Sequence, residues 1–240
     1  MKNLIFTTND VLHIIRNGAT SNEKIAKPGE VVVQTYHFDR AQFEFVKNGG
    51  KGVSTKTGFL NPELTAKNCG GCPLRHGGCY TFKFTQAMGH LSMLRSVVKQ
   101  YGTFDRIPGL MGLDLEKLAE ATAGRYVRFG AYGNPDTMPL DVVEFMCNQA
   151  KTWTGYTHNW KQPAKFEYLK YFMASAHSDK TEWAPVAGIR SFVTDGATGV
   201  QCPASDEYYN KTGKKVTCSQ CGLCSGLKGK GKGNVRINSH

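Results

Sequence analysis

Eight cysteines are the residues of this chain best suited to chemistry, and seven of them fall into two spaced groups. Thiolates spaced by two residues, with glycines between them, can converge on one metal ion or iron–sulfur cluster, because a short loop brings the sulfurs together. The first group follows a C-x2-C-x6-C pattern, and the second joins one distant cysteine to a C-x2-C-x2-C run. The two groups comprise Cys69, Cys72 and Cys79, and Cys202, Cys218, Cys221 and Cys224. We expect metal binding at both groups.

The second group offers four thiolates, enough for one tetrahedral zinc ion or one [4Fe–4S] cluster. Its triple run, with the distant Cys202 followed by Pro203, is similar to the cluster-binding pattern of bacterial ferredoxins. Zinc ribbons use two separated C-x2-C pairs instead. The pattern therefore favours an iron–sulfur cluster, with zinc as the alternative. The eighth cysteine, Cys147, lies in an apolar helical stretch and is predicted to be a small buried side chain.

The first group has three thiolates, which would leave one iron of a cluster open to a substrate, a water molecule or a cofactor. His76 could instead complete a zinc site, or the C-terminal run could supply the fourth ligand. The sequence leaves open how the seven thiols divide among sites. Disulfides are the weaker interpretation, because seven is odd and an intracellular chain is kept reduced.

Composition indicates a folded protein of the cytoplasm. The chain has 240 residues with 13 Phe, 10 Tyr and 3 Trp, ample for a core. No apolar run is long enough to span a bilayer, and the apolar stretch at the N-terminus is short for a signal peptide. We expect no membrane partner.

The positive charge is concentrated near the C-terminus. The net charge is +11, and residues 211–240 hold seven Lys or Arg and no acidic residue. The Lys/Gly alternation over 228–233 predicts a flexible tail at 227–240. Such a tail could contact nucleic acid or an acidic partner, or serve only to keep the protein in solution.

Strand and helix patterns alternate at βαβ spacing, which predicts an α/β fold with a partial or full (β/α) barrel-like parallel sheet and cysteine-rich loops. We expect an irregular strand-rich region at 1–60, a barrel-like core at 61–200 and a cysteine-rich cluster segment at 201–226. The predicted helices are 86–101, 115–122, 139–151, 164–171 and a helical turn at 180–187. The predicted strands are 31–36, 126–130, 153–157, 172–175 and 189–193.

In such folds the binding site lies at the carboxyl ends of the strands. The candidate cofactor-binding residues there are Gly130, Tyr132, Gly133, Asn134, His158 and His177. Ordinary turn residues, or histidines with a structural hydrogen bond, would give the same pattern. No catalytic residue can be named. The chain has no Ser-His-Asp order, HExxH or paired-carboxylate motif, which argues against a simple hydrolase.

Four segments together resemble a family of mostly uncharacterised phage and prophage proteins: NCGGCPLRHGGCY (68–80), VRFGAYGNPD (127–136), TGYTHNW (154–160) and CPAS…CSQCGLCSG (202–226). The layout is more distantly similar to radical-SAM proteins, which carry a three-cysteine cluster loop, a barrel and an auxiliary cluster. This resemblance implies that residues 130–135 would hold SAM, with an electron donor as partner. Radical-SAM loops typically read C-x3-C-x2-C, so the first group departs from that pattern.

The resemblance implies an iron–sulfur protein of phage type with redox or radical-SAM-like chemistry. The alternative is a zinc-stabilised phage protein that binds nucleic acid through its basic tail or has a structural role.

Overall fold

The first three strands form an antiparallel meander because their apolar side chains alternate between two faces. Strands β1 (Leu4–Thr8) and β2 (Val11–Ala19) are joined by Asn9 and Asp10, whose φ angles of 47° and 62° suit a two-residue hairpin turn. Strand β3 (Val31–Asp39) pairs antiparallel with β2. These residues belong to the predicted strand-rich region at 1–60, and they form one sheet with the strands that follow.

Two further strands continue this sheet in the parallel direction. Strand β4 (Tyr126–Tyr132) pairs with β3, and β5 (Thr152–Thr154) pairs with β4. The strand order is therefore β1-β2-β3-β4-β5. Parallel neighbours joined through helices are typical of an α/β fold.

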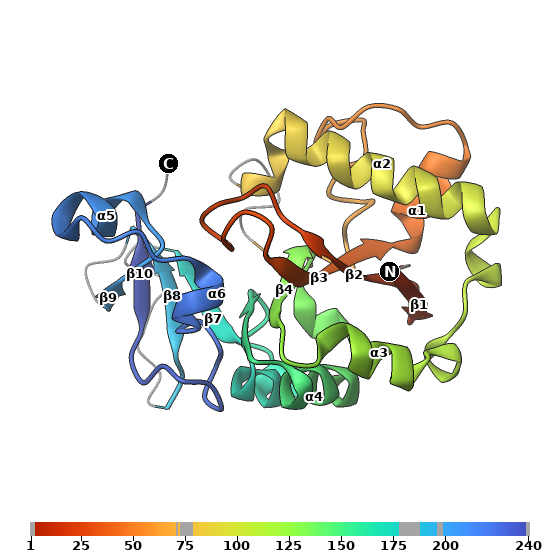
Figure 1. The fold of residues 1–240 in the computed structure, drawn as a ribbon. Coiled ribbons are helices and arrows are strands. Elements are labelled where there is room, and N and C mark those ends of the chain that lie inside the picture. Colours follow the sequence, from red (N-terminus) through yellow and green to blue (C-terminus); the bar gives the residue numbers. More distant parts are fainter. Residues whose placement is uncertain (1–2, 71, 73–78, 178–187, 196–198, 239–240) are drawn as a thin grey trace.

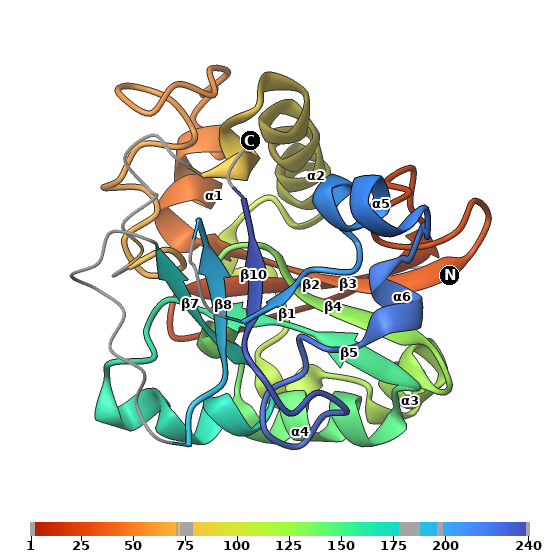
Figure 2. The same ribbon diagram turned by 90° about the vertical axis from the view of Figure 1, so that its left-hand side faces the viewer.

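Four helices cover the two faces of this sheet (Figures 1 and 2). Helices α1 (Arg40–Lys47) and α2 (Phe84–Tyr101) pack on one face, where Ile14 and its neighbours form an apolar cluster. Helices α3 (Leu115–Thr122) and α4 (Leu140–Gln149) pack on the other face. The first sheet is thus buried on both sides.

A second sheet lies beside the first, and its neighbouring strands all run parallel (Figure 1). In sheet order its strands are β6 (Tyr156–Thr157), β7 (Met173–His177), β8 (Ser191–Thr194), β10 (Val235–Ile237) and β9 (Val200–Gln201). Gly155 alone separates β5 from β6, so one stretch of chain contributes to both sheets.

The computed structural model describes residues 3–70, 72, 79–177, 188–195 and 199–238. Its remaining helical elements are η2 (Tyr80–Phe82), η3 (Phe104–Arg106), η4 (Leu110–Gly112), η5 (Pro135–Thr137), η6 (Pro163–Lys170), α5 (Asp206–Thr212) and α6 (Cys218–Cys221). No helix of these ranges is both long and apolar enough to cross a membrane.

The mixed α/β class predicted from the sequence is confirmed. The predicted helix at 164–171 is instead the 3-10 helix η6. Lys165 and Tyr168, three residues apart, both donate hydrogen bonds to carbonyls of the segment after β4, those of Asp136 (2.6 Å) and Met138 (2.7 Å). A 3-10 helix brings residues i and i+3 to the same side, so it suits this double anchor better than an α-helix. The predicted turn at 180–187 lies outside the described residues.

The chain after residue 226, predicted to be a flexible tail, is built into the fold up to residue 238. The N–H groups of Leu227 and Lys228 donate to the carbonyls of Leu169 (3.1 Å) and Lys170 (2.8 Å), and β10 lies between β8 and β9. The Gly/Lys composition has few apolar side chains to bury, but backbone hydrogen bonds and the buried Val235 hold the segment in place.

A pair of buried histidines links β2 to β3. Nδ1 of His13 lies 2.9 Å from Nδ1 of His37, and the other ring nitrogens contact Oγ1 of Thr8 (2.6 Å) and Oγ1 of Thr35 (3.0 Å). Thr35 also accepts a hydrogen bond from the N–H of Gly130 at 2.9 Å. Burial lowers the pKa of His37 to about 3 and that of His13 well below its usual value. Both rings are therefore neutral at pH 7.

The free energy of unfolding should fall as the pH decreases below 6.5, because unfolded histidines bind protons that His13 and His37 reject when folded. The stability of the folded state with both rings neutral is present in full above pH 6.5. It is lost progressively as the pH falls toward the folded pKa values of His13 and His37. Each contributes up to about 1.4 kcal/mol per pH unit in that window. Urea unfolding at pH 7.5, 6.5 and 5.5 measures the slope. His13→Gln should make it shallower, and an equal slope in the variant would contradict this assignment.

Candidate metal centre

The second cysteine group lies on three segments that meet beside β5 and β6. Cys202 follows β9, and its N–H donates to a carbonyl of β10 at 2.8 Å. Cys218 and Cys221 are the first and last residues of α6. The carbonyl of Cys224 accepts a hydrogen bond from the N–H of Gly155 at 3.0 Å, at the break between β5 and β6. The fold thus brings four cysteines together from segments separated in the sequence.

Each of these four thiols lies within electrostatic range of the other three. In all six pairs, the negative charge of one thiolate raises the pKa of another. Burial is the larger cause, and it raises the pKa of Cys218 to about 12. In the described ranges, no group of three or more Cys, His, Asp or Glu side chains already stands close enough to hold a metal ion.

Backbone N–H groups point at two of the sulfurs. The N–H of Ala204 donates to Cys202 and that of Leu223 to Cys221, and each bond lowers the pKa of its thiol against the effect of burial. Gly222 allows the second of these turns, because its φ of 62° is in the left-handed region. N–H donors of this kind stabilise thiolates and set the properties of bound clusters.

Tyr156 closes one side of the group. Its hydroxyl donates a hydrogen bond to the sulfur of Cys224, which lowers the pKa of that thiol against burial. Cys202, Tyr156 and Phe192 pack against an apolar cluster that contains Cys224. Cys202 and Cys224 thus pack with side chains of the second sheet, whereas Cys218 packs against the apolar cluster of Val32 and Tyr126 in the first sheet.

A buried arginine holds the loop that carries Cys224. Arg190, 7 % exposed, donates from its guanidinium to the carbonyls of Leu223 (2.7 Å), Gly226 (2.6 Å) and Gly233 (3.0 Å). Among the described residues it forms no ion pair with a carboxylate. Burial lowers its pKa, and the charge of Cys224 opposes this shift. The three carbonyl oxygens are therefore the partners of this buried cation, and Cys224 is the nearby group whose ionisation would favour its charge.

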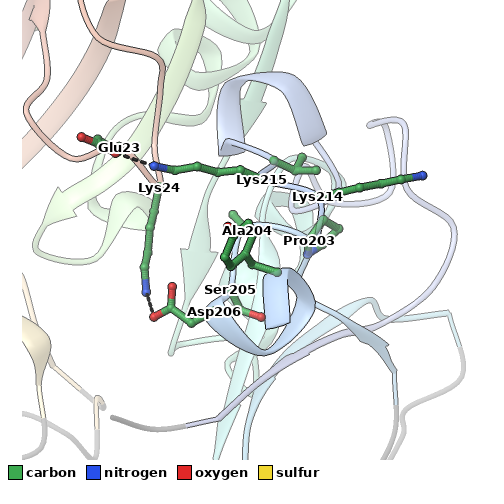
Figure 3. A pocket seen from close by; sticks show the side chains of 10 residues that line it. Glu23, Lys24, Pro203, Ala204, Ser205, Asp206, Lys214 and Lys215 are labelled. Carbon is green, nitrogen blue, oxygen red and sulfur yellow. Dashed lines mark hydrogen bonds and ion pairs between the residues drawn. The ribbon is translucent and has the colours of Figure 1, made fainter. Parts of the chain in front are cut away.

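The connection between β2 and β3 packs against the same cysteine segment. The N–H groups of Cys218 and Ser219 donate to the carbonyls of Lys24 and Ile25, both at 2.9 Å. A cavity of about 270 Å³ lies at this contact, beside the residues that follow Cys202. Figure 3 shows two ion pairs across it, Lys24 with Asp206 (2.8 Å) and Lys215 with Glu23. They join the β2–β3 connection to the C-terminal segment.

The first cysteine group begins at Asn68, which is anchored to the carboxyl ends of β3 and β4. The N–H of Asn68 donates to Oδ1 of Asp39 at 2.5 Å, and its Nδ2 donates to the carbonyl of His37 at 2.6 Å. Its own carbonyl accepts a hydrogen bond from the N–H of Asn134 at 2.6 Å. The cysteine loop therefore starts at the strand ends where the sequence predicts a site.

Two thiols of this group converge on Tyr132. The charges of Cys69 and Cys79 both add to burial in raising the pKa of Tyr132. The sulfur of Cys79 also lies 3.0 Å from Oγ1 of Thr81. Cys72 is buried, and its N–H donates to the carbonyl of Cys69 at 3.1 Å. Two of the three thiols, those of Cys69 and Cys79, therefore lie near the end of β4.

The charges of the two cysteine groups raise the pKa of different tyrosines. Cys202, Cys218 and Cys224 raise the pKa of Tyr156, whereas the first group acts on Tyr132. The seven thiols are thus divided between two ends of the fold. His76, the alternative ligand of the first group, lies outside the described residues.

Two glycines at the end of β4, Gly130 within the strand and Gly133 directly after it, are required by a tight turn against β3. Gly130 and Gly133 have φ angles of 66° and 74°, and a Cβ at Gly133 would lie 2.6 Å from the carbonyl oxygen of His37. Tyr132 and Asn134 between and after them are 2 % and 4 % exposed. The segment predicted to hold SAM therefore packs closely against the protein and supports the first cysteine loop.

The other predicted strand-end residues follow neighbouring strands. His158 follows β6 and His177 ends β7, and these strands pair in parallel. The N–H of His158 donates to Oδ1 of Asn134 at 3.3 Å. The buried Asp136 accepts a hydrogen bond from Nδ2 of Asn159 at 3.1 Å, and burial raises the pKa of its carboxyl. Side-chain contacts therefore tie the ends of β4 and β6 together.

The chain matches no protein-family model, no curated protein and no solved structure. Function is therefore inferred from the two cysteine groups and their surroundings.

Two residues that support the second group were missed from the sequence. Arg190 is a single charge between Ile189 and the apolar strand β8, which is the signal that could have revealed a buried, partnered guanidinium. Tyr156 lies in a short strand with no cysteine nearby in the sequence, so its contact with Cys224 has no sequence signal.

The Lys/Gly alternation yields a matched pair of variants. A Cβ at Gly231 would lie 2.1 Å from Nη2 of Arg190 and 2.7 Å from the carbonyl of Leu223, whereas one at Gly233 meets nothing within 4 Å. Gly231→Ala should lower the free energy of unfolding by about 1–3 kcal/mol through overpacking, and Gly233→Ala should be close to neutral. Urea unfolding of both variants measures this. Equal free energies of unfolding of the two variants would mean that the Lys/Gly segment does not pack against Arg190, as the flexible tail predicted from the sequence implies.

Proposed function

We propose that Cys202, Cys218, Cys221 and Cys224 ligate one [4Fe–4S] cluster and that the protein is an iron–sulfur protein. The observation that supports this most is the mutual electrostatic proximity of four thiols, of which Cys224 is buried and the other three are partly buried. The C-x2-C-x2-C run with a distant cysteine before proline favours a cluster over zinc. The site's residues would hold the cluster by four thiolate bonds, and the cluster would supply electron transfer.

The surroundings of the four thiols fit an anionic metal centre. Arg190 is a buried cation beside Cys224, and N–H groups of Ala204 and Leu223 donate to sulfurs. A metal–thiolate centre with four cysteines carries net negative charge, which such donors stabilise. Without a metal, the protonated thiols are more stable than the thiolates, because burial disfavours four adjacent negative charges.

The first group would hold a second metal centre with three thiolates and one open position. Cys69 and Cys79 meet at Tyr132, and the loop begins at the ends of β3 and β4. This placement supports redox or radical-SAM-like chemistry at the carboxyl ends of the strands, with SAM as candidate cofactor and an electron donor as partner. The more distant similarity of the layout to radical-SAM proteins supports a cluster-bearing barrel, although the C-x2-C-x6-C spacing departs from the radical-SAM pattern.

The scaffold for both centres would be a partial barrel. Gly155 is the only residue between β5 and β6, and its carbonyl accepts a hydrogen bond from Met173 of β7 at 3.0 Å. We infer that the parallel strands from β3 to β8 form one curved surface with the first cysteine group at its carboxyl end.

The iron–sulfur proposal is tested with Cys221→Ala, using Cys147→Ala as the matched control. Cys147 is buried among the apolar side chains that contact α4, away from the four thiols. Iron and acid-labile sulfide are measured on protein purified without oxygen, with the absorbance near roughly 400 nm. Cys221→Ala should lose about half of the iron when both groups hold clusters, or all of it when one does. The control should keep the wild-type content.

Equal iron in the two variants, or no iron in the wild type, would contradict the proposal. Zinc in place of iron would favour the alternative, a zinc-stabilised nucleic-acid-binding or structural phage protein. Exposed Lys230 and Lys232 would then be the residues to replace with Gln, because deleting residues 227–240 would also remove β10.

A further inference from the structure

The loop between α6 and β10 carries alternating lysines and glycines that face opposite ways. Lys230 and Lys232 are exposed, whereas Gly231 between them is buried, and a Cβ there would overlap the guanidinium of Arg190. Because Arg190 donates to three carbonyls of this loop, the lysines project from a backbone that is held in place. The loop therefore presents its charges to solvent from a folded surface.

The charges of Lys230 and Lys232 are unpaired in the part of the chain that the structure describes, where neither side chain forms an ion pair or a hydrogen bond. The preceding lysine, Lys228, is paired with Glu144 of α4 at 2.9 Å and with the hydroxyl of Tyr171 at 2.7 Å. The carboxylate that contacts the loop is thus already neutralised. Two unpaired ammonium groups, on backbone positions at most about 7 Å apart, remain on the loop beside α4 (Figures 1 and 2).

The backbone of this loop adds further donors. Within the described ranges, the N–H groups of residues 229–233 have no hydrogen-bond acceptor. Consecutive N–H groups of a loop can bind an anion, and phosphate oxygens of nucleic acids accept hydrogen bonds from backbone N–H groups as well as from lysines. A phosphate at Lys230 or Lys232 would therefore meet a charged donor and unpaired amide donors on the same short segment.

Two exposed apolar side chains belong to the segments that meet beside these lysines. Leu227 is 47 % exposed and Phe166 is 49 % exposed. The N–H of Leu227 donates to the carbonyl of Leu169 at 3.1 Å, and Leu169 lies one turn of η6 after Phe166. Single-stranded nucleic acid is bound by this combination of groups, because bases stack on an exposed aromatic ring while cations contact the phosphates.

We propose that this surface binds single-stranded nucleic acid, with Lys230 and Lys232 on the phosphates and Phe166 stacked on a base. The N–H groups of residues 229–233 would donate to phosphate oxygens. All of these contacts are to phosphates and base faces, so little preference for base sequence is expected. The surface contains no cysteine, and the proposal does not depend on which metal the cysteine groups hold.

The lysine contacts are tested by fluorescence anisotropy of labelled oligodeoxythymidine with the full chain, between about 50 and 200 mM salt. The double variant Lys230→Gln, Lys232→Gln should weaken binding and reduce the slope of log K against log salt by about 1.4, because each phosphate contact to a single strand contributes about 0.7. The matched control is Lys56→Gln, Lys99→Gln, which removes two exposed lysines from the α1–α2 side of the molecule. The control should keep the wild-type slope.

The stacking contact is tested in the same assay with Phe166→Ala. This variant should weaken binding about fivefold or more without changing the salt slope, because stacking on an aromatic ring releases no counterions. Phe84→Ala is the matched control, since Phe84 is 70 % exposed at the start of α2. All of the replaced side chains are exposed, and urea unfolding checks that each variant keeps the wild-type stability.

The proposal is overturned when the oligonucleotide does not bind, or when the control lysine variant reduces the slope as much as the loop variant. Equal binding by Phe166→Ala and Phe84→Ala would exclude stacking, and tighter binding of duplex DNA would do the same. Vesicles of phosphatidylglycerol that displace the oligonucleotide at a lower phosphate concentration would identify a membrane surface as the partner and overturn it too. None of these outcomes alters the iron content, so failure of the nucleic-acid surface and failure of the iron–sulfur proposal are distinguishable.

Discussion

The buried guanidinium of Arg190 is the interaction on which the C-terminal half depends. Removing an arginine from water costs several kcal/mol unless its donors are satisfied. Here they are satisfied by three backbone carbonyls, those of Leu223 and Gly226 before the Lys/Gly alternation and that of Gly233 at its end. The glycines of that alternation leave space for the guanidinium, as the close approach at Gly231 shows. A segment with almost no apolar side chains can thus fold around a charge.

This constraint extends to the first sheet through the cysteine loop. Because Arg190 holds the carbonyl of Leu223, the next residue, Cys224, is positioned to accept the N–H of Gly155. That hydrogen bond holds Gly155, the residue at which the chain passes from β5 to β6. The second cysteine group and the junction of the two sheets are therefore one structural unit. A metal bound by the four thiols would also stabilise this junction, since it would join α6, β9 and the loop after α6.

Much of the fold could be predicted from the sequence, whereas less of the candidate site could. Apolar periodicity predicted α3 at its observed ends, and β-branched runs predicted most strands, because these signals are local. The contacts of the predicted flexible tail had no local signal, since the partners of Leu227 and Lys228 lie some sixty residues earlier in the chain. Cysteine spacing predicted which thiols belong together in the second group. It could not predict Tyr156 or Arg190, whose contacts depend on how distant segments pack.

Cations around the thiols explain why this arrangement favours an anionic centre. Arg190, just before β8, lies within electrostatic range of Cys224, and Arg128 of β4 within range of Cys218. Burial opposes ionisation of each thiol, and each ionised thiol opposes its neighbours. A bound metal would remove both penalties at once, because it would neutralise part of the charge and draw the sulfurs together. The arginines would then balance the remaining negative charge.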